Sequence, residues 1–227
     1  LDPKKILESL RGDTVKFKND KIETPDMYLG ARLQFKDING HQTWSITSVD
    51  YIKAAVATIR ESLKSKGRKF PGTAKTPIQI TFVPELDVTE ELGTEDIRFY
   101  QEMIGMLRWA TELGRVDILQ EISILSQFQA SPREGHLEQL IHIFGYLNNK
   151  PKLSIYMDPD LPVFPTGATF TSSNEFKEYY RDAEEPMPHQ MPRPRGRAVT
   201  TTAFVDASHG ANKVTRRSHT GFILFVN

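Results

Sequence analysis

The sequence predicts an α+β protein, made of a hairpin, a cluster of helices and a second pair of strands. Three observations predict this class. Asn39-Gly40, a preferred tight-turn dipeptide, separates two strand-like runs within residues 27–46. In four later segments, apolar residues recur every three or four positions, as on one face of a helix. After a proline-rich stretch, two apolar runs at residues 199–206 and 222–226 predict a second pair of strands.

The first predicted helix, residues 48–66, has an apolar face and a basic face. Its apolar face carries Val49, Ile52, Val56, Ile59 and Leu63. Its opposite face carries Lys53, Arg60 and Lys64. Thr47 and Asp50 have the spacing of a capping box at the start, and Gly67 favours an end just beyond the last turn.

Three further helices are predicted after a linker rich in Pro, Gly and Thr at residues 67–93. The next helix, residues 94–114, has an apolar stripe of Tyr100, Met103, Ile104 and Leu107. A third helix covers about residues 116–129. The fourth begins with Ser131 as cap, Pro132 at the first position and Glu134 three residues after the cap. A strand at 153–157 and a proline-rich linker at 158–197 follow.

Composition excludes several classes of protein. The 227 residues include 29 basic and 29 acidic ones, and 38% are hydrophobic, which is typical of globular chains and not of disordered ones. No apolar run reaches membrane-spanning length, the first residues do not form a secretion signal, and Cys is absent. We therefore expect a protein that is not secreted and has no membrane partner. The chain starts with Leu1 and stops within an apolar run, so we expect a piece of a longer polypeptide.

The charges are unevenly distributed. Residues 85–102 contain seven acids and one base, whereas residues 189–217 contain six bases and one acid, Asp206. The basic stretch is where a polyanion is expected to bind, and a solvated tail is the alternative. Within it, Arg216 and Arg217 offer guanidinium groups suited to phosphate, or simply form a solubilising loop.

Asp206 closes the strand Ala203-Phe204-Val205-Asp206. A carboxylate at a strand end can ligate Mg²⁺, but it can equally form an Asx-turn. Two-metal chemistry needs several carboxylates, and the sequence offers one plausible member.

Gln101, Gly105, Arg108 and Trp109 lie on the 94–114 helix. A mid-helix glycine costs about 1 kcal/mol relative to Ala, so Gly105 indicates the close approach of either a sugar–phosphate backbone or another helix. From spacing alone, Trp109 is expected in the core.

Taken together, these segments resemble the Ty1/copia class of retrotransposon polyproteins. The motifs that carry the resemblance follow one another in the family's order over almost the whole chain: Tyr28-Leu29-Gly30, Tyr51-Ile52, Thr76-Pro77, Tyr100 to Trp109, Arg115-Val116-Asp117-Ile118, Ser126, Pro132, His136, Tyr146-Leu147, Phe204 to Ala207 and Arg216 to Phe222. Val116 stands where the family has Pro, and Ser208 where it has a second Asp.

The resemblance implies roles for these residues. Met27, Tyr28, Leu29 and Gly30 correspond to a primer grip. Gln101, Gly105 and Trp109 correspond to contacts of a thumb helix with the minor groove of an RNA–DNA hybrid or primer–template duplex. Asp206 corresponds to the first metal-ligating carboxylate of ribonuclease H, which uses Mg²⁺ in the intact parent protein.

The resemblance also implies an organisation and a limit. It assigns residues 1–70 to the end of a polymerase palm, 71–150 to a thumb-like helical cluster, 151–197 to a connection and 198–227 to the first strands of ribonuclease H. The paired polymerase aspartates and the remaining ribonuclease acids are missing, so we expect the chain alone to be inert.

The implied partner, besides nucleic acid, is the rest of the polyprotein, in a retroelement particle of the cytoplasm or nucleus. The alternative is a degenerate or domesticated element that acts as a protein-interaction module. A third reading, an aspartic protease using Asp206, lacks the glycine of that motif.

Overall fold

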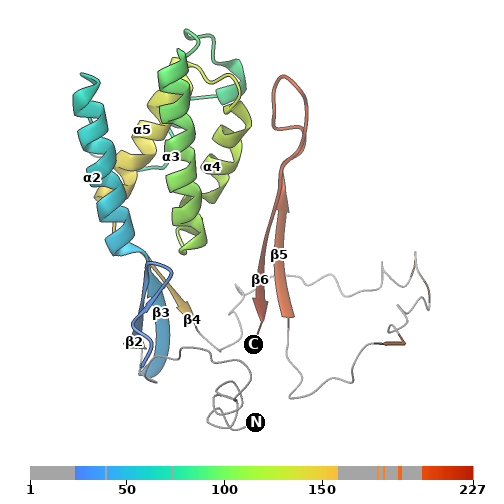
Figure 1. The fold of residues 1–227 in the computed structure, drawn as a ribbon. Coiled ribbons are helices and arrows are strands. Elements are labelled where there is room, and N and C mark those ends of the chain that lie inside the picture. Colours follow the sequence, from blue (N-terminus) through green and yellow to red (C-terminus); the bar gives the residue numbers. More distant parts are fainter. Residues whose placement is uncertain are drawn as a thin grey trace. The chain divides into compact units, whose positions relative to one another are not determined.

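The α+β class is confirmed by the computed structural model (Figure 1). The structure describes residues 24–38, 40–72, 74–157 and 201–226, with residues 178, 181, 189 and 190. It divides into two compact units. The first comprises Leu1–Phe82 and Thr89–Tyr156, and the second comprises Val83–Val88 and Met157–Asn227.

All four predicted helices are present in the first unit. They are α2 (Val49–Ser65), α3 (Thr94–Glu112), α4 (Leu119–Leu125) and α5 (Glu134–Asn149). Short 3₁₀ turns at Val116–Ile118 and Ser126–Phe128 flank α4, so the third predicted helix is one α-helical segment between two tighter turns. In Figure 1, α3 stands between α2 and α4.

One apolar core holds these helices together. It takes Ile52 and Leu63 from α2 and extends through α3 and α4 to α5, which buries most of its length. Two tyrosines add hydrogen bonds between elements. The Tyr51 hydroxyl donates to the Met106 carbonyl at 2.9 Å, and the buried Tyr100 hydroxyl donates to the Leu125 carbonyl at 2.8 Å. This core joins residues from both 1–70 and 71–150, the ranges that the resemblance assigns to palm and thumb. Those domain assignments stay predictions.

The predicted hairpin is part of a four-stranded sheet. The strands β1 (Met27–Tyr28), β2 (Ala31–Ile38), β3 (His41–Thr47) and β4 (Ser154–Met157) are ordered β1-β2-β3-β4. β2 and β3 pair antiparallel, with Phe35 opposite Trp44. The sequence predicted β4 as a strand but not its place in this sheet. The Thr47 hydroxyl donates to the Leu153 carbonyl at 3.0 Å and helps to hold β4 beside β3.

The predicted start of α5 is wrong. The helix is capped by Arg133, not Ser131, and the Arg133 N–H donates to Nδ1 of His136 at 3.0 Å. The reason is a competing contact. The Pro132 carbonyl accepts a hydrogen bond from the Leu92 N–H, so this segment runs beside residues 90–92 as an extended chain before the helix begins.

The start of α2 differs from its prediction as well, while two helix ends agree. Ser48, not Thr47, stands at the cap of α2 and makes no side-chain capping hydrogen bond, and the Thr47 hydroxyl donates to the Leu153 carbonyl just before β4 instead. Gly67 and Gly114 follow α2 and α3 with φ of +68° and +101°, the left-handed backbone that favours glycine after a helix.

The second unit contains a two-stranded antiparallel sheet. β5 (Thr201–Ala207) and β6 (Thr220–Val226) confirm the two predicted C-terminal strands, with Asp206 opposite Gly221. A 3₁₀ turn at Pro84–Leu86 belongs to this unit, and Glu85 accepts a hydrogen bond from the Lys213 N–H at 2.8 Å. The predicted linker at 158–197 lies almost entirely outside the described residues. Among the helices that the structure describes, none combines the length and apolar character that crossing a bilayer requires.

Candidate nucleic-acid interface

Helix α3 has one buried face and one exposed face. Tyr100, Met103, Ile104 and Leu107 are buried at the spacing predicted from the sequence. Because residues three and four apart share a helix face, Gln101, Gly105 and Trp109 lie on another side, and all three are exposed.

The environments of these three residues bear on the alternatives left open by the sequence. Trp109 is 40% exposed, so the expectation that it belongs to the core is wrong. A Cβ added at Gly105 would meet nothing within 4 Å, so no helix approaches this glycine among the described residues. Gln101 donates its amide N–H to the Gln129 carbonyl at 3.0 Å, which holds the side chain against the segment after α4. The stripe is therefore an open surface, and Gly105 leaves a shallow place in it.

The charges around this stripe are mixed. Arg98 and Arg108 are exposed on α3, but so are Glu95, Glu102 and Glu112. α3 alone therefore provides no net positive charge for a phosphate backbone. The chemistry that the stripe offers is an aromatic face, an amide and an uncovered backbone, which suit sugars and base edges better than phosphates.

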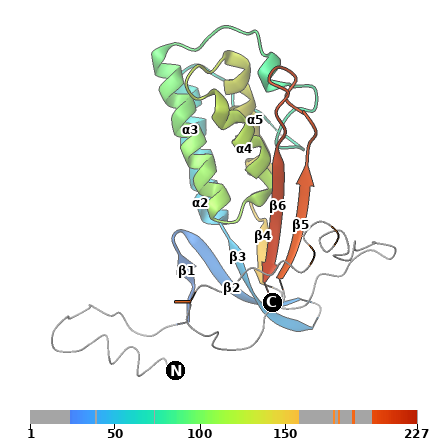
Figure 2. The same cartoon turned by 90° about the vertical axis from the view of Figure 1, so that its right-hand side faces the viewer.

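The turn between β1 and β2 lies against the C-terminal end of α3. An added Cβ at Gly30 would lie 4.0 Å from Cδ1 of Leu113, one helical turn after Trp109. Met27, Tyr28 and Leu29 are exposed in this turn, Tyr28 to 64%. The β1–β2 turn thus lies near the C-terminal end of α3 within one unit (Figure 2).

The backbone of this turn is unusual. Leu29 and Gly30 have φ of +51° and +90°, the combination of a type I′ turn, in which a leucine is rare. Non-glycine residues in this conformation cost free energy and cluster at functional sites. The sequence does not predict this turn, since Leu-Gly is not a typical pair for it.

The other predicted residues lie in the second unit. Asp206 is exposed on β5, and Arg216 and Arg217 are exposed in the loop before β6. No hydrogen bond or ion pair between Asp206 and either arginine is recorded within the described region. The loop has its own order, because the Arg216 N–H donates to the Asn212 carbonyl and the Asn212 N–H donates to the Arg217 carbonyl.

A two-metal site does not fit the residues of this strand pair. Asp206 is the only carboxylate in residues 201–226, and two Mg²⁺ ions need several. Across the described residues there is no group of three or more His, Cys, Asp or Glu placed to share a metal ion.

A buried ion pair lies on the turn between α3 and α4. Arg115 donates to both carboxylate oxygens of Asp117 at 2.8 Å, and the Tyr146 hydroxyl donates to Asp117 Oδ2 at 2.9 Å. Burial alone would raise the pKa of Asp117, but the hydrogen bonds and charge of Arg115 hold that pKa below its ordinary value. Burial is the largest cause that raises the pKa of Glu121, and the negative charge of Asp117 raises it further. The Arg115–Asp117 pair therefore has a structural role.

Comparison with known proteins identifies one relative and no family model. The chain is 26% identical over 211 residues to a Saccharomyces cerevisiae protein assigned to transposon Ty5-1. The match covers 92% of this chain and 61% of the relative, so the chain spans less than two thirds of that protein's length. No protein-family model matches, and no solved structure matches. The chain is thus similar to a transposon protein over most of its length.

Proposed function

We propose that this chain is part of a retrotransposon reverse transcriptase and binds primer–template duplex or RNA–DNA hybrid. In this proposal residues 1–70 end the palm, 71–150 form the thumb, 151–197 connect, and 198–227 begin a ribonuclease H domain. The polymerase belongs to the Ty1/copia class, which the order of the motifs along the chain supports.

One observation carries the proposal. Trp109 lies on the exposed side of α3 one turn before Leu113, the residue nearest Gly30 of the β1–β2 turn, and Leu29 in that turn has a strained backbone. Trp109 leaves 40% of its surface exposed, and Gly105, which has no close neighbour, costs helix stability. A duplex with its minor groove along α3 and its primer end at the turn accounts for both features.

Catalysis in this proposal belongs to the intact polyprotein, which is the second partner of this chain. In the parent, Asp206 is one of several carboxylates for Mg²⁺, and Arg216 and Arg217 contact phosphate. This chain alone lacks the other carboxylates and is therefore inactive. The parent works in a retroelement particle of the cytoplasm or nucleus.

The binding test uses the full chain and a labelled RNA–DNA hybrid, with fluorescence anisotropy as the readout. Gln101→Ala combined with Trp109→Ala should weaken binding about 5- to 150-fold, since one aromatic contact to a nucleobase is worth about 1–3 kcal/mol. Because neither side chain is charged, the dependence of log Kd on log salt concentration should keep its slope.

Two further variants separate binding from folding. Leu119→Ala with Gln120→Ala is the matched control, since it removes one exposed apolar side chain and one exposed glutamine from α4. It should leave affinity unchanged. Gly105→Ala should weaken binding while it stabilises the helix, a combination that loss of folding cannot produce.

Three outcomes would contradict the proposal: no affinity for the hybrid, equal losses in the α3 and α4 variants, or Gly105→Ala binding as wild type. Protein association that is insensitive to salt, without any affinity for hybrid, would support the interaction module instead.

The inactivity of the chain alone has a separate test. Incubation of the chain with the hybrid and Mg²⁺ should leave the RNA strand intact on a denaturing gel. Mg²⁺-dependent cleavage that Asp206→Asn abolishes would show that the missing acids are not needed.

A further inference from the structure

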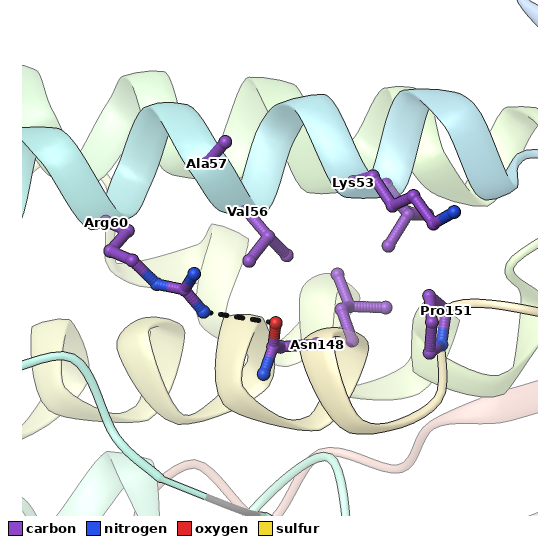
Figure 3. A pocket seen from close by; sticks show the side chains of 8 residues that line it. Lys53, Val56, Ala57, Arg60, Asn148 and Pro151 are labelled. Carbon is purple, nitrogen blue, oxygen red and sulfur yellow. Dashed lines mark hydrogen bonds between the residues drawn. The ribbon is translucent and has the colours of Figure 1, made fainter.

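The loop between β5 and β6 carries three bases whose side chains have no partner in the described chain. Lys213, Arg216 and Arg217 are exposed, and none of their side chains makes a hydrogen bond or ion pair with a described residue. In the first unit, by contrast, Arg60 of α2 donates to Asn148 of α5 (Figure 3). The charge of the loop is therefore available to a ligand.

The backbone of this loop uses almost all of its N–H groups locally. Asn212 Oδ1 accepts from the N–H groups of Val214 and Thr215 at 3.1 and 2.7 Å. The Asn212 carbonyl accepts from the Arg216 N–H at 2.9 Å. Between residues 213 and 216, the N–H of Lys213 is thus the one that serves a group outside the loop.

An acidic side chain from a distant part of the chain takes that N–H. Oε1 of Glu85 accepts from the Lys213 N–H at 2.8 Å, although the two residues are 128 positions apart. Glu85 lies on the 3₁₀ turn Pro84–Leu86, which belongs to the same compact unit as the loop. A hydrogen bond from a backbone N–H to a carboxylate is charge-assisted and stronger than one to a neutral acceptor. The loop therefore already binds one anionic oxygen.

The Glu85 carboxylate uses only part of what the loop offers. It forms no ion pair with Lys213, Arg216 or Arg217 among the described residues. Ionic contacts of a carboxylate at an exposed position are weak. A phosphate group has more acceptor oxygens, so one oxygen can take the Lys213 N–H while two others accept from an arginine, which binds phosphate bidentately. The loop can therefore hold a phosphate more firmly than it holds Glu85.

We propose that residues 213–217 form a phosphate site and that Glu85 occupies it until a phosphate of a nucleic-acid backbone displaces the carboxylate. This rests on the proposed function, in which Arg216 and Arg217 contact phosphate. It adds the Lys213 N–H as a donor and Glu85 as an intramolecular competitor.

The sign of one effect separates competition from a purely structural contact. If Glu85 only fastens the turn to the loop, its removal loosens the loop, and the affinity for phosphate falls or stays the same. If Glu85 competes for the Lys213 N–H, its removal raises that affinity.

The first experiment titrates the full chain with inorganic pyrophosphate and follows the backbone amide of Lys213 by proton–nitrogen NMR. The wild-type amide should shift saturably. Glu85→Gln removes the competing charge and should bind pyrophosphate about two- to fivefold more tightly. Glu85→Ala also removes the acceptor and should bind at least as tightly as Glu85→Gln, which keeps the test valid if one substitution disturbs the turn.

Two control variants accompany this titration. Glu90→Gln removes the same charge from an exposed glutamate five residues after Glu85 and outside the compact unit of the loop. It should keep the wild-type Kd. Arg216→Ala combined with Arg217→Ala removes the two guanidinium groups and should weaken pyrophosphate binding at least about fivefold.

The second experiment compares Glu85→Gln with Glu90→Gln on a labelled RNA–DNA hybrid by fluorescence anisotropy. Tighter binding of the hybrid by Glu85→Gln alone supports a site for the nucleic-acid backbone. A gain with pyrophosphate but not with hybrid overturns that source and assigns the site to a free phosphorylated ligand. Complete failure to bind hybrid contradicts the proposed function, while the pyrophosphate titration still tests the loop.

Three results would overturn the phosphate site itself. The first is a Lys213 amide that pyrophosphate leaves unshifted in wild type and in both Glu85 variants. The second is binding by Glu85→Gln and Glu85→Ala that is no tighter than wild type. The third is a gain with Glu90→Gln as large as the gain with Glu85→Gln.

Discussion

Replacing Asp117 by Asn tests how much stability the Arg115 ion pair contributes. Arg115 is 1% exposed, and Asp117 is the only acid paired with it in the described chain. The Nη1 atom of Arg115 is buried without a hydrogen-bond partner, so the guanidinium already lacks one hydrogen bond. Without the Asp117 charge, a buried cation remains that no carboxylate compensates.

The expected cost follows from this burial. Removing one partner of a buried ion pair typically destabilises a protein by about 3–5 kcal/mol. The Asp117 side chain is 25% exposed, so water partly replaces the lost partner. We therefore expect the low end, about 3 kcal/mol. Tyr146→Phe removes one hydrogen bond to the same carboxylate and should cost about 1.5 kcal/mol.

Urea unfolding monitored by circular dichroism measures both effects. With an m-value of about 2 kcal/mol/M, Asp117→Asn should lower the midpoint by about 1.5 M. Arg115→Met combined with Asp117→Leu removes both charges and should recover most of the loss, because apolar replacements of a buried pair are often neutral. The reasoning is refuted if Asp117→Asn keeps the wild-type midpoint, or if the double variant is less stable than Asp117→Asn.

The pH dependence provides a second check. The pKa of Asp117 is depressed in the folded protein, so the unfolded chain binds the proton more readily. The stabilisation from the ionised Asp117 carboxylate is complete above its ordinary pKa of about 3.9 and is lost as pH falls through the pKa of the folded protein. The stability difference between wild type and Asp117→Asn should therefore shrink below about pH 4.

Three further predictions concern other residues. Gly105→Ala should raise the free energy of unfolding by about 0.5–1 kcal/mol. Gly145→Ala should lower it by about 1–3 kcal/mol, because a Cβ at Gly145 would lie 2.8 Å from Cγ of Pro71. Urea unfolding should therefore show a higher midpoint for the first variant and a lower midpoint for the second. Glu121→Gln should stabilise the protein at pH 7 by about 0.5 kcal/mol. The pKa of Glu121 is raised in the folded protein, so its ionisation costs stability as pH rises. Equal urea midpoints for wild type and Glu121→Gln at pH 7 would contradict this prediction. His136→Ala should lower the melting temperature, because it removes the acceptor of the N–H at the start of α5, and His136→Asn should restore part of the loss.

The helices were predictable because their buried apolar residues recur every three or four positions. The buried positions of α3 are those that its apolar spacing predicted, and the glycines after α2 and α3 end those helices as expected. The hairpin was equally predictable, since β2 and β3 pair antiparallel over the two predicted runs. Local patterns decide these elements, and no distant contact competes with them.

Distant contacts decided the features that the sequence did not predict. Thr47 had the spacing of a helix cap, but a strand more than a hundred residues later takes its hydroxyl. Ser131 had the stronger capping pattern, but Pro132 pairs with Leu92 and delays the helix. Trp109 was expected in the core, but the packing of the neighbouring helices leaves it 40% exposed.

The candidate site was partly predictable in the same sense. Gln101, Gly105 and Trp109 were selected by resemblance, and their exposure on one side of α3 is consistent with that choice without testing it. The bases of the loop before β6 were visible in the sequence as Lys213, Arg216 and Arg217. The contact of this loop with Glu85 was not, because it joins residues 128 positions apart.

The place of β4 beside β3 affects how the chain can fold during synthesis. The hydrogen bond from Thr47 to Leu153 links residues 106 positions apart. A nascent chain therefore exposes an unpaired edge of β3 until the ribosome has made every helix in between. Pairings across such distances form slowly, and open edges promote aggregation. A product truncated before residue 150 should accumulate as insoluble material, whereas one that includes β4 should not.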